Sequence, residues 1–107
     1  MSTHIRTADL DEKQQEWGGI KSVFESSKVV PGSGFTFGTI RYDAPHHSGR
    51  HEDHEALYVL NGSGVARLSE DRITISAGSF LHIPAGVDHG IEEILASPLE
   101  CVLIHFR

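Results

Sequence analysis

From residue 20 onward the chain is a series of short apolar runs separated by glycine, proline, asparagine and serine, and this punctuation restricts the fold more than any other feature. Runs of four to eight residues bounded by turn residues are typical of β-strands joined in hairpins. No long amphipathic helix separates them, which argues against alternating strands and helices. The pattern predicts an all-β sandwich or barrel of about eight strands, at residues 20–25, 35–42, 56–61, 65–69, 72–76, 79–83, 89–94 and 99–107.

The chain of 107 residues has the length of one domain, and no stretch has the composition of a linker. We expect a single domain, with residues 1–19 as an N-terminal leader and residues 20–107 as the β-barrel. Asp9 to Glu16 are mostly helix formers, with Asp9 as a possible N-cap and Gly18–Gly19 as a stop, so a short helix is one interpretation. The other is a solvated leader with Trp17 packed on the barrel.

Charge and composition exclude several partners and compartments. The formal net charge is -6, whereas nucleic acids and anionic membranes attract clustered lysine and arginine. Neither a signal peptide nor a membrane span is recognisable in the sequence. The single cysteine, Cys101, cannot form an internal disulfide, which fits a reducing compartment. We therefore expect a cytoplasmic protein that binds no nucleic acid and no membrane.

Histidine is concentrated in one short segment. Of the eight histidines, four lie within nine positions, beside three acidic residues. Imidazole nitrogens and a carboxylate oxygen are ligands that a divalent transition metal accepts when no thiolate is available. A solvated polar loop is the alternative, since a histidine-rich tract by itself is only compositional information. The residues concerned are His46, His47, His51 and His54, beside Glu52, Asp53 and Glu55.

The spacing of these residues favours a metal site. His51 is followed after three residues by Glu55 and after six more by Gly62. Downstream, Gly78 is followed after five residues by Pro84-Ala85-Gly86, and after two more by His89. The two stretches resemble the two signature motifs of the cupin superfamily.

The resemblance has two departures from the family pattern. In the first motif, a histidine is expected two positions before His51, and Gly49 stands there. In the second motif, an asparagine is expected four positions after His89, and Glu93 stands there. The match of the second motif from Gly78 to His89 has no gap and is specific. The resemblance covers roughly residues 35–106 in hydrophobic pattern, and residues 49–89 carry the motifs.

The resemblance implies a double-stranded β-helix, or jelly-roll barrel, with one divalent transition metal ion (Fe, Mn, Ni, Co, Cu or Zn) inside it. The implied ligands are His51, Glu55 and His89. The residues agree with this independently, because Glu55 shares a strand face with apolar Leu57 and Val59, where an unpaired charge would be costly.

For the fourth ligand, our first choice is His47, returned to the ion by a bulge at Ser48–Arg50. His46 and His54 are alternatives, although His54 has the opposite strand parity to Glu55. If none of them binds, two histidines and one carboxylate form a facial triad, the arrangement of non-haem Fe(II) oxygenases.

Four further residues are candidates for a substrate pocket. Arg41 and Tyr42 point to opposite faces of one strand, and whichever faces inward can bind a carboxylate or hydroxyl; a surface ion pair is the alternative for Arg41. His82 alternates with Phe80, and His105 alternates with Leu103 and Cys101, so either histidine can reach the cavity. Core or surface packing is the alternative for both.

The resemblance to cupins favours a small-molecule metalloenzyme, such as an Fe(II) dioxygenase acting on a small organic acid or a phenol. A metal-dependent isomerase, lyase or decarboxylase is the alternative, with Glu55 or a free histidine moving a proton. A non-enzymatic module that binds or senses a small ligand is a third class, because fold does not fix function.

A homodimer is expected from one strand. Residues Ala56 to Leu60 are apolar at every position, so both faces of this strand require cover. The barrel interior covers one face, and a second subunit can cover the other. β-Strand dimers are also common in the family that the motifs resemble.

Overall fold

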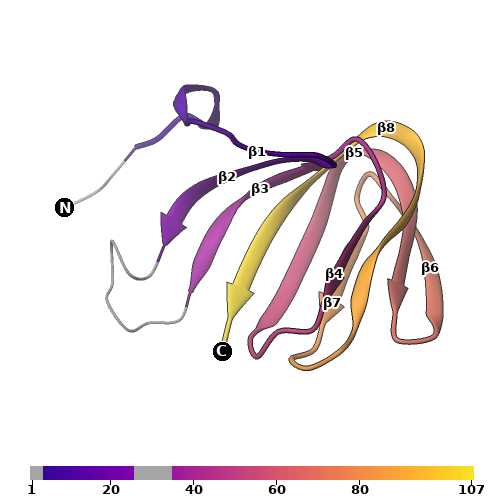
Figure 1. Ribbon diagram of the computed structural model, residues 1–107. Helices are drawn as coiled ribbons and strands as arrows, with labels where there is room; N and C mark the ends of the chain where they lie inside the picture. The colour runs from indigo at the N-terminus through magenta and orange to yellow at the C-terminus, as the bar shows by residue number, and fades with distance from the viewer. Residues whose placement is uncertain (1–3, 26–34) are drawn as a thin grey trace.

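The computed structural model describes residues 4–25 and 35–107, which form two packed layers of antiparallel β-strands (Figure 1). The all-β jelly-roll prediction is confirmed. Apart from one 3₁₀ turn, η1 (Thr7–Asp9), all the described elements are strands: β1 (Lys13–Gln15), β2 (Gly18–Glu25), β3 (Thr36–Tyr42), β4 (His46–Gly49), β5 (His54–Leu68), β6 (Asp71–Ser76), β7 (Phe80–Ile83) and β8 (His89–Phe106).

Two long strands, β5 and β8, run through both layers. In the first layer, the N-terminal half of β5 pairs with the C-terminal half of β8. This half of β5 also pairs with β7, this half of β8 pairs with β3, and β2 and β1 extend the layer from β3. In the second layer, the C-terminal half of β5 pairs with the N-terminal half of β8, flanked by β6 and β4. The sandwich is therefore held together by one strand pair that continues from one layer into the other.

The sequence predicted turns where β5 and β8 are continuous. Residues 62–64 were expected to separate two strands, but β5 bends there and continues. Gly62 makes this bend possible: its φ is +80°, and a Cβ atom on it would lie 2.2 Å from the carbonyl oxygen of Pro98 on β8. Pro98 likewise interrupts no strand. Residues 26–34, which separate the first two predicted strands, lie outside the described residues.

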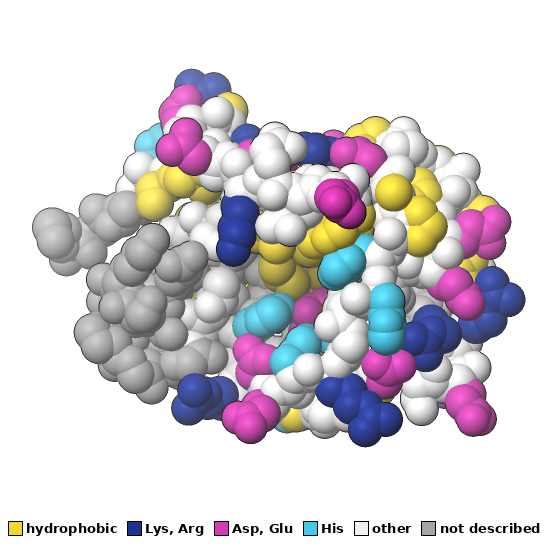
Figure 2. All heavy atoms as spheres, in the orientation of Figure 1, with side chains coloured by type: hydrophobic (Ala, Val, Ile, Leu, Met, Phe, Trp, Pro, Cys, Tyr) yellow, Lys and Arg dark blue, Asp and Glu magenta, His cyan; other side chains and the backbone are white. Residues whose placement is uncertain are grey.

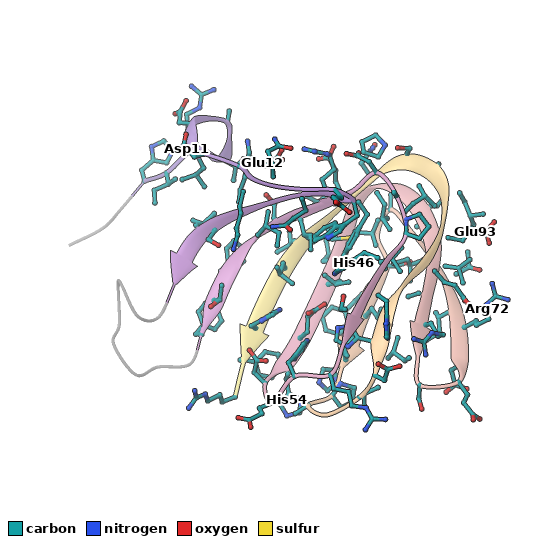
Figure 3. The ribbon with its side chains drawn as sticks, viewed as in Figure 1. Asp11, Glu12, His46, His54, Arg72 and Glu93 are labelled. Carbon is teal, nitrogen blue, oxygen red and sulfur yellow. The ribbon has the colours of Figure 1, made fainter. Side chains whose placement is uncertain are left out.

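The predicted N-terminal helix at residues 9–16 is wrong. Only η1 is helical, and the next residues form β1, which pairs with β2 (Lys13 opposite Ile20). An isolated helix of eight residues is marginal in water, whereas the edge of the sheet offers a row of backbone partners. Glu12, which precedes β1 (Figure 3), also pairs with Arg41 of β3. Of the second interpretation, the packing of Trp17 against the barrel is confirmed, whereas the leader is not simply solvated, because Lys13–Gln15 join the sheet as β1.

The core lies between the two layers and is built by alternation along each strand. The interior faces contribute Ile40, Tyr42, Leu57, Val59, Ile75, Leu81, Ile83, Ile91, Leu99, Cys101 and Leu103, all buried. Glu55 and His89 are the buried polar or charged residues of the described chain. Figure 2 shows histidine side chains gathered near apolar and acidic ones on one face of the molecule. None of the helices described is long and apolar enough to cross a membrane. The cytoplasmic location stays a prediction.

Candidate metal centre

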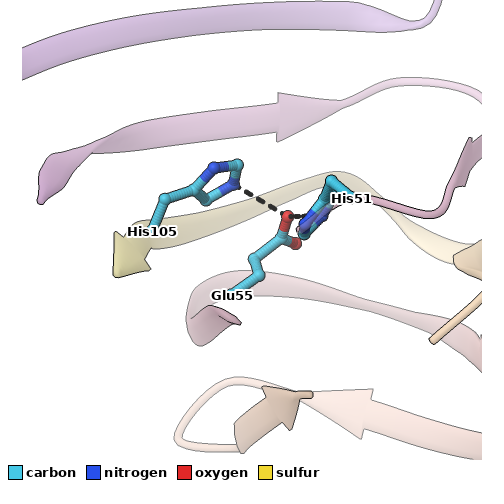
Figure 4. A group of neighbouring side chains, drawn as sticks. All are labelled: His51, Glu55 and His105. Atoms are coloured by element: carbon cyan, nitrogen blue, oxygen red, sulfur yellow. Dashed lines mark hydrogen bonds and ion pairs between the residues drawn. The ribbon is translucent and has the colours of Figure 1, made fainter. Parts of the chain in front are cut away.

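Four side chains from three parts of the chain meet at the N-terminal end of β5. Glu55 points into the barrel, and His105 lies directly opposite on β8 (Figure 4). His51 comes from the loop between β4 and β5, and His89 begins β8. Glu55 is 6% exposed and His89 only 2%, so the polar groups meet in a region where each needs a partner.

The three histidines direct Nε2 toward the same carboxylate oxygen. From Glu55 Oε1, the distances are 2.9 Å to His105 Nε2, 3.3 Å to His51 Nε2 and 3.7 Å to His89 Nε2. Ligands bound about 2.1 Å from one ion are about 3.0 Å apart at octahedral angles and about 3.4 Å apart at tetrahedral angles. The separations of His105 and His51 match this range, and the ligand atoms of His51, Glu55 and His105 all lie within 4.8 Å of one another. His89 Nε2 lies farther out, 3.7 Å from Glu55 Oε1, so it would have to move inward to bind the same ion.

The opposite ring nitrogen of each histidine is held by another group. Asp53 contacts two of them: its Oδ1 is 2.9 Å from His51 Nδ1, and its Oδ2 is 3.2 Å from His105 Nδ1. His89 Nδ1 is 3.0 Å from the carbonyl oxygen of Val87. Nδ1–H therefore donates in each case, which leaves Nε2 to the centre. Histidines that bind metal are oriented in this way.

A bound cation would resolve an unfavourable feature of the site. His51 Nε2 and His89 Nε2 are buried, and neither has a hydrogen-bond partner among the described residues. When Nδ1 carries the proton, Nε2 presents a lone pair to the Glu55 carboxylate, and two acceptors face each other at the cost of an unsatisfied buried group. An ion between them would be bound by both. The residues present thus fit a divalent transition metal ion.

The charges of the cluster depend on one another. Burial raises the pKa of Glu55, but the hydrogen bond from His105 and the nearby ring of His89 outweigh burial, so that this pKa is about 2. The hydrogen bond to Glu55 raises the pKa of His105. Burial lowers the pKa of His89, but Glu55 and the Val87 carbonyl outweigh it and the net shift is upward. In the metal-free protein, protons on these histidines would balance the buried carboxylate.

His47, the first choice for a fourth ligand, lies elsewhere. It is on β4 with its side chain 63% exposed, and its Nε2 is 2.9 Å from Asp88 Oδ1. Asp88 also binds Arg67, with 3.1 Å between Oδ2 and Nη2. The segment Ser48–Arg50 thus does not return His47 to Glu55. The position nearest the carboxylate is taken by His105, which the sequence suggested only as a pocket residue.

His54 and His82 lie together on the outer face of the sheet. Their ring atoms Nδ1 and Nε2 are 3.0 Å apart, and both rings stack with Phe106. Strand parity explains this, since His54 is one residue from inward-facing Glu55, and His82 one residue from buried Ile83. Neither residue lines the cavity described below.

A cavity of about 170 Å³ opens beside Glu55, between β3, β4 and the C-terminal end of β8. Tyr42 and His105, two of the four predicted pocket residues, line it. Arg41 does not, because its side chain binds Glu12 and Asp43 outside the barrel. The lining consists of Trp17, Ile20, Ile40, Tyr42, His46, Ser48, His51, Glu55, Leu103 and His105.

Comparison with known proteins places the chain among cupins. The family model described as "Cupin domain" matches residues 38–105, which include all four clustered side chains. A search of curated protein sequences found no match.

Several solved structures have the same fold. A variant of oxalate decarboxylase from Bacillus subtilis superposes with a TM-score of 0.80 at 15% identity, and covers 95% of this chain and 28% of its own. Another structure of that enzyme, whose title refers to its Mn(II) centres, has 16% identity, a TM-score of 0.80 and the same coverage, 95% and 28%. The cupin domain of Schizosaccharomyces pombe Cnp3 has a TM-score of 0.79 at 12% identity, with 96% of this chain and 72% of its own covered. This chain therefore spans only about a quarter of the decarboxylase, and likeness at these identities shows the fold alone.

Proposed function

Because this chain belongs to the cupin domain family, we propose that its barrel holds one divalent transition metal ion and that the protein is a metalloenzyme acting on a small molecule. His51, Glu55 and His105, whose ligand atoms lie within 4.8 Å of one another, would bind the ion, and His89, with its Nε2 3.7 Å from Glu55 Oε1, would complete the ligand set. The observation that carries the proposal is the convergence of three Nε2 atoms on Glu55 Oε1, while the Nδ1 atom of each histidine contacts an oxygen of Asp53 or Val87. His105 replaces the histidine that the first motif lacks at Gly49.

The reaction that we propose is oxygenation of the substrate by O₂. If bound by these residues, a redox-active ion such as Fe(II) would supply the site at which O₂ is activated. In a dioxygenase both oxygen atoms enter the substrate, so the substrate supplies all the electrons and no further reductant is required. The apolar lining around Ile20, Ile40 and Leu103 supports an organic substrate, since it favours a ligand with an apolar body beside the centre.

A metal-dependent lyase, isomerase or decarboxylase is the second candidate, and His46 favours it. This histidine lines the cavity without contacting Glu55, and burial together with the neighbouring His47 lowers its pKa. His46 is therefore neutral at pH 7 and can accept a proton from a bound substrate. In that reaction the ion would act as a Lewis acid.

The two reactions differ in oxygen demand. Fe(II)-loaded protein should consume one O₂ per molecule of product when it is offered a panel of phenols and small carboxylic acids in an oxygen electrode. Product formation under argon, with CO₂ release or isomerisation, would contradict oxygenation and support the second candidate. The metal content of the same sample shows whether the centre was loaded.

Asp53 should be required for high metal affinity although it is not a ligand. Asp53→Asn removes the charge that orients His51 and His105, and loss of such a partner weakens metal binding by about 10- to 100-fold. Isothermal titration with Zn²⁺ or Mn²⁺ measures the change. Asp43→Asn is the matched control, because the Asp43 carboxylate accepts a hydrogen bond from Arg41 on the outer surface, away from the cluster. Equal affinities in both variants would show that Asp53 does not position the histidines.

We also propose a homodimer through the outer face of β5 and β7. Tyr58, Leu60 and Phe80 are 46%, 50% and 67% exposed there, and Tyr58 pairs directly with Phe80 across the strands. An apolar cluster of this kind favours a two-fold contact with a second copy. Light scattering at micromolar concentration should give twice the chain mass of 11.7 kDa, and Phe80→Ser should shift the mass to the monomer. A wild-type monomer would refute this contact.

A further inference from the structure

Tyr42 places a hydroxyl group in the barrel interior without a partner among the described residues. The residue is only 2% exposed, and no hydrogen bond within that part of the chain involves its hydroxyl oxygen. Among the described side chains, the fully enclosed polar atoms that lack a partner are Nε2 of His51 and Nε2 of His89, so the Tyr42 oxygen keeps a small accessible surface. Because the ring packs in the core and against Trp17, that surface faces the cavity that Tyr42 lines.

Packing alone does not explain a tyrosine at this position. A hydroxyl group that is taken out of water without a compensating hydrogen bond lowers the stability of the folded protein. Phenylalanine would form the same stack on Trp17, whose ring centroid is 5.1 Å from that of Tyr42, without this cost. Burial, followed by the Glu55 carboxylate, raises the pKa of Tyr42, so its hydroxyl keeps the proton and can both donate and accept. The hydroxyl is therefore available to a ligand.

The register of β3 and β8 places Tyr42 away from the metal centre along the cavity. Tyr42 pairs with Leu99, which lies six residues before His105 on β8. Between these two positions the cavity is lined by Ile40 of β3 and Leu103 of β8, both apolar. The cavity thus joins the metal centre to a hydroxyl group across an apolar wall.

We propose that Tyr42 recognises the end of the ligand that is remote from the ion. The ligand is then a small molecule with two polar groups separated by a short apolar segment: one group binds the ion, and the other forms a hydrogen bond with the Tyr42 hydroxyl. Ile40 and Leu103 contact the segment between them. This inference rests on the proposed metal centre and narrows its substrate class, for the oxygenase and for the second candidate alike.

Calorimetric titration of the Zn²⁺-loaded protein with pairs of probes of equal size tests this role. In each pair a carboxylate binds the ion, and the far end is either a hydroxyl or a methyl group: β-hydroxypropionate against butyrate, and γ-hydroxybutyrate against valerate. The two pairs cover two lengths of the apolar segment. In at least one pair the hydroxyl-ended probe should bind about tenfold more tightly, because the methyl-ended probe leaves the Tyr42 hydroxyl unpaired.

Two variants locate the preference. Tyr42→Phe should abolish it and leave the Zn²⁺ affinity unchanged, because the hydroxyl is not a metal ligand. Tyr58→Phe is the matched control: it removes the same group from a side chain that is 46% exposed on the outer face, and it should keep the preference. It also leaves Tyr42 as the only tyrosine of the chain. With tyrosine labelled at ¹³Cζ, the NMR signal of Tyr42 in that variant should shift with the hydroxyl-ended probe and less with the methyl-ended one.

Several results would overturn the role of Tyr42 and leave the metal centre standing. A preference that persists in Tyr42→Phe would show that the hydroxyl of the probe binds the ion itself. Equal affinities of both probes for the wild type, an unshifted Tyr42 signal, or no binding of any probe to protein shown to hold one Zn²⁺ would also overturn it. The NMR measurement keeps Tyr42 and so covers the case in which Tyr42→Phe does not fold. Protein that takes up no Zn²⁺ would instead refute the metal centre, on which the inference rests.

Discussion

Glu55→Gln should reduce affinity for a divalent transition metal by more than about 100-fold, the largest effect expected of any single substitution here. Removal of a group that only orients a ligand costs about 10- to 100-fold, and Glu55 supplies the one anionic ligand, so its loss costs more. The amide has the same shape as the carboxylate but no charge, so the barrel should keep its packing.

Equilibrium dialysis of the variant against Mn²⁺ or Zn²⁺, followed by elemental analysis, measures this effect. Glu93→Gln is the matched control: it makes the same chemical change at an exposed position of β8. Wild-type metal content in Glu55→Gln would remove Glu55 from the ligand set. Loss of metal from both variants would point to a general effect of charge.

The stabilisation that a metal ion confers should grow steeply with pH. The ion replaces protons on imidazoles, and the pKa values of His89 and His105 both lie above the ordinary 6.5. Below the pKa of a histidine, each fall of one pH unit lowers the metal affinity by about tenfold, because the ion must displace that proton. Displacement of two protons lowers the affinity by up to about 100-fold per pH unit. A saturating ion should raise Tm by roughly 10 to 20 °C at pH 8, and by little at pH 5.5.

The stability of the metal-free protein should instead fall as the pH rises from 5.5 to 8. A raised histidine pKa stabilises the folded state fully below 6.5, and the contribution of His89 and His105 is lost as the pH rises through their folded values. For Glu55, with a pKa of about 2 against 4.5, the contribution is present above 4.5 and is lost as the pH falls toward 2. The metal-free protein should therefore be most stable between about pH 4.5 and 6.5.

Thermal unfolding followed by circular dichroism at pH 5.5, 6.5, 7.5 and 8, with chelator or with excess metal, compares the two trends. A difference in Tm between the loaded and the metal-free protein that is the same at every pH would contradict replacement of histidine protons by the ion. In Glu55→Gln the two curves should coincide at every pH.

The sequence predicted the fold class and the inward position of Glu55 because both depend on local alternation. Short apolar runs between turn residues specify antiparallel strands, and Glu55 has the same parity as buried Leu57 and Val59. Parity also predicted that His54 points away from the site, and it lies beside His82 on the outer face.

The roles of His105 and Asp53 were missed because they depend on contacts between distant parts of the chain. His105 is 50 residues from Glu55 and reaches it only through the pairing of β5 with β8. A signal was present: His105 alternates with Cys101 and Leu103, both of which are buried, and this places it on the interior face. For Asp53 no periodic signal exists, because it lies in a loop whose path the flanking residues do not determine.

The N-terminal segment and the long strands show a different limit of sequence patterns. Residues 9–16 have helix-forming composition, yet pairing with β2 determines their structure. Gly62 was interpreted as a turn residue, and its positive φ is indeed required, but for a bend within one strand. In both cases the partner strand decided the outcome, and the composition of the segment alone did not specify it.

The most direct test of the account is the ratio of metal to protein after purification and anaerobic reconstitution at pH 7.5. We expect one equivalent of a divalent transition metal per chain. We expect the same ratio in the double variant His54→Ala, His82→Ala, which removes the exposed histidine pair on the outer face. No bound ion after incubation with Fe, Mn, Co, Ni, Cu and Zn in turn, or an ion that is lost only with the outer pair, would contradict a metal centre at Glu55.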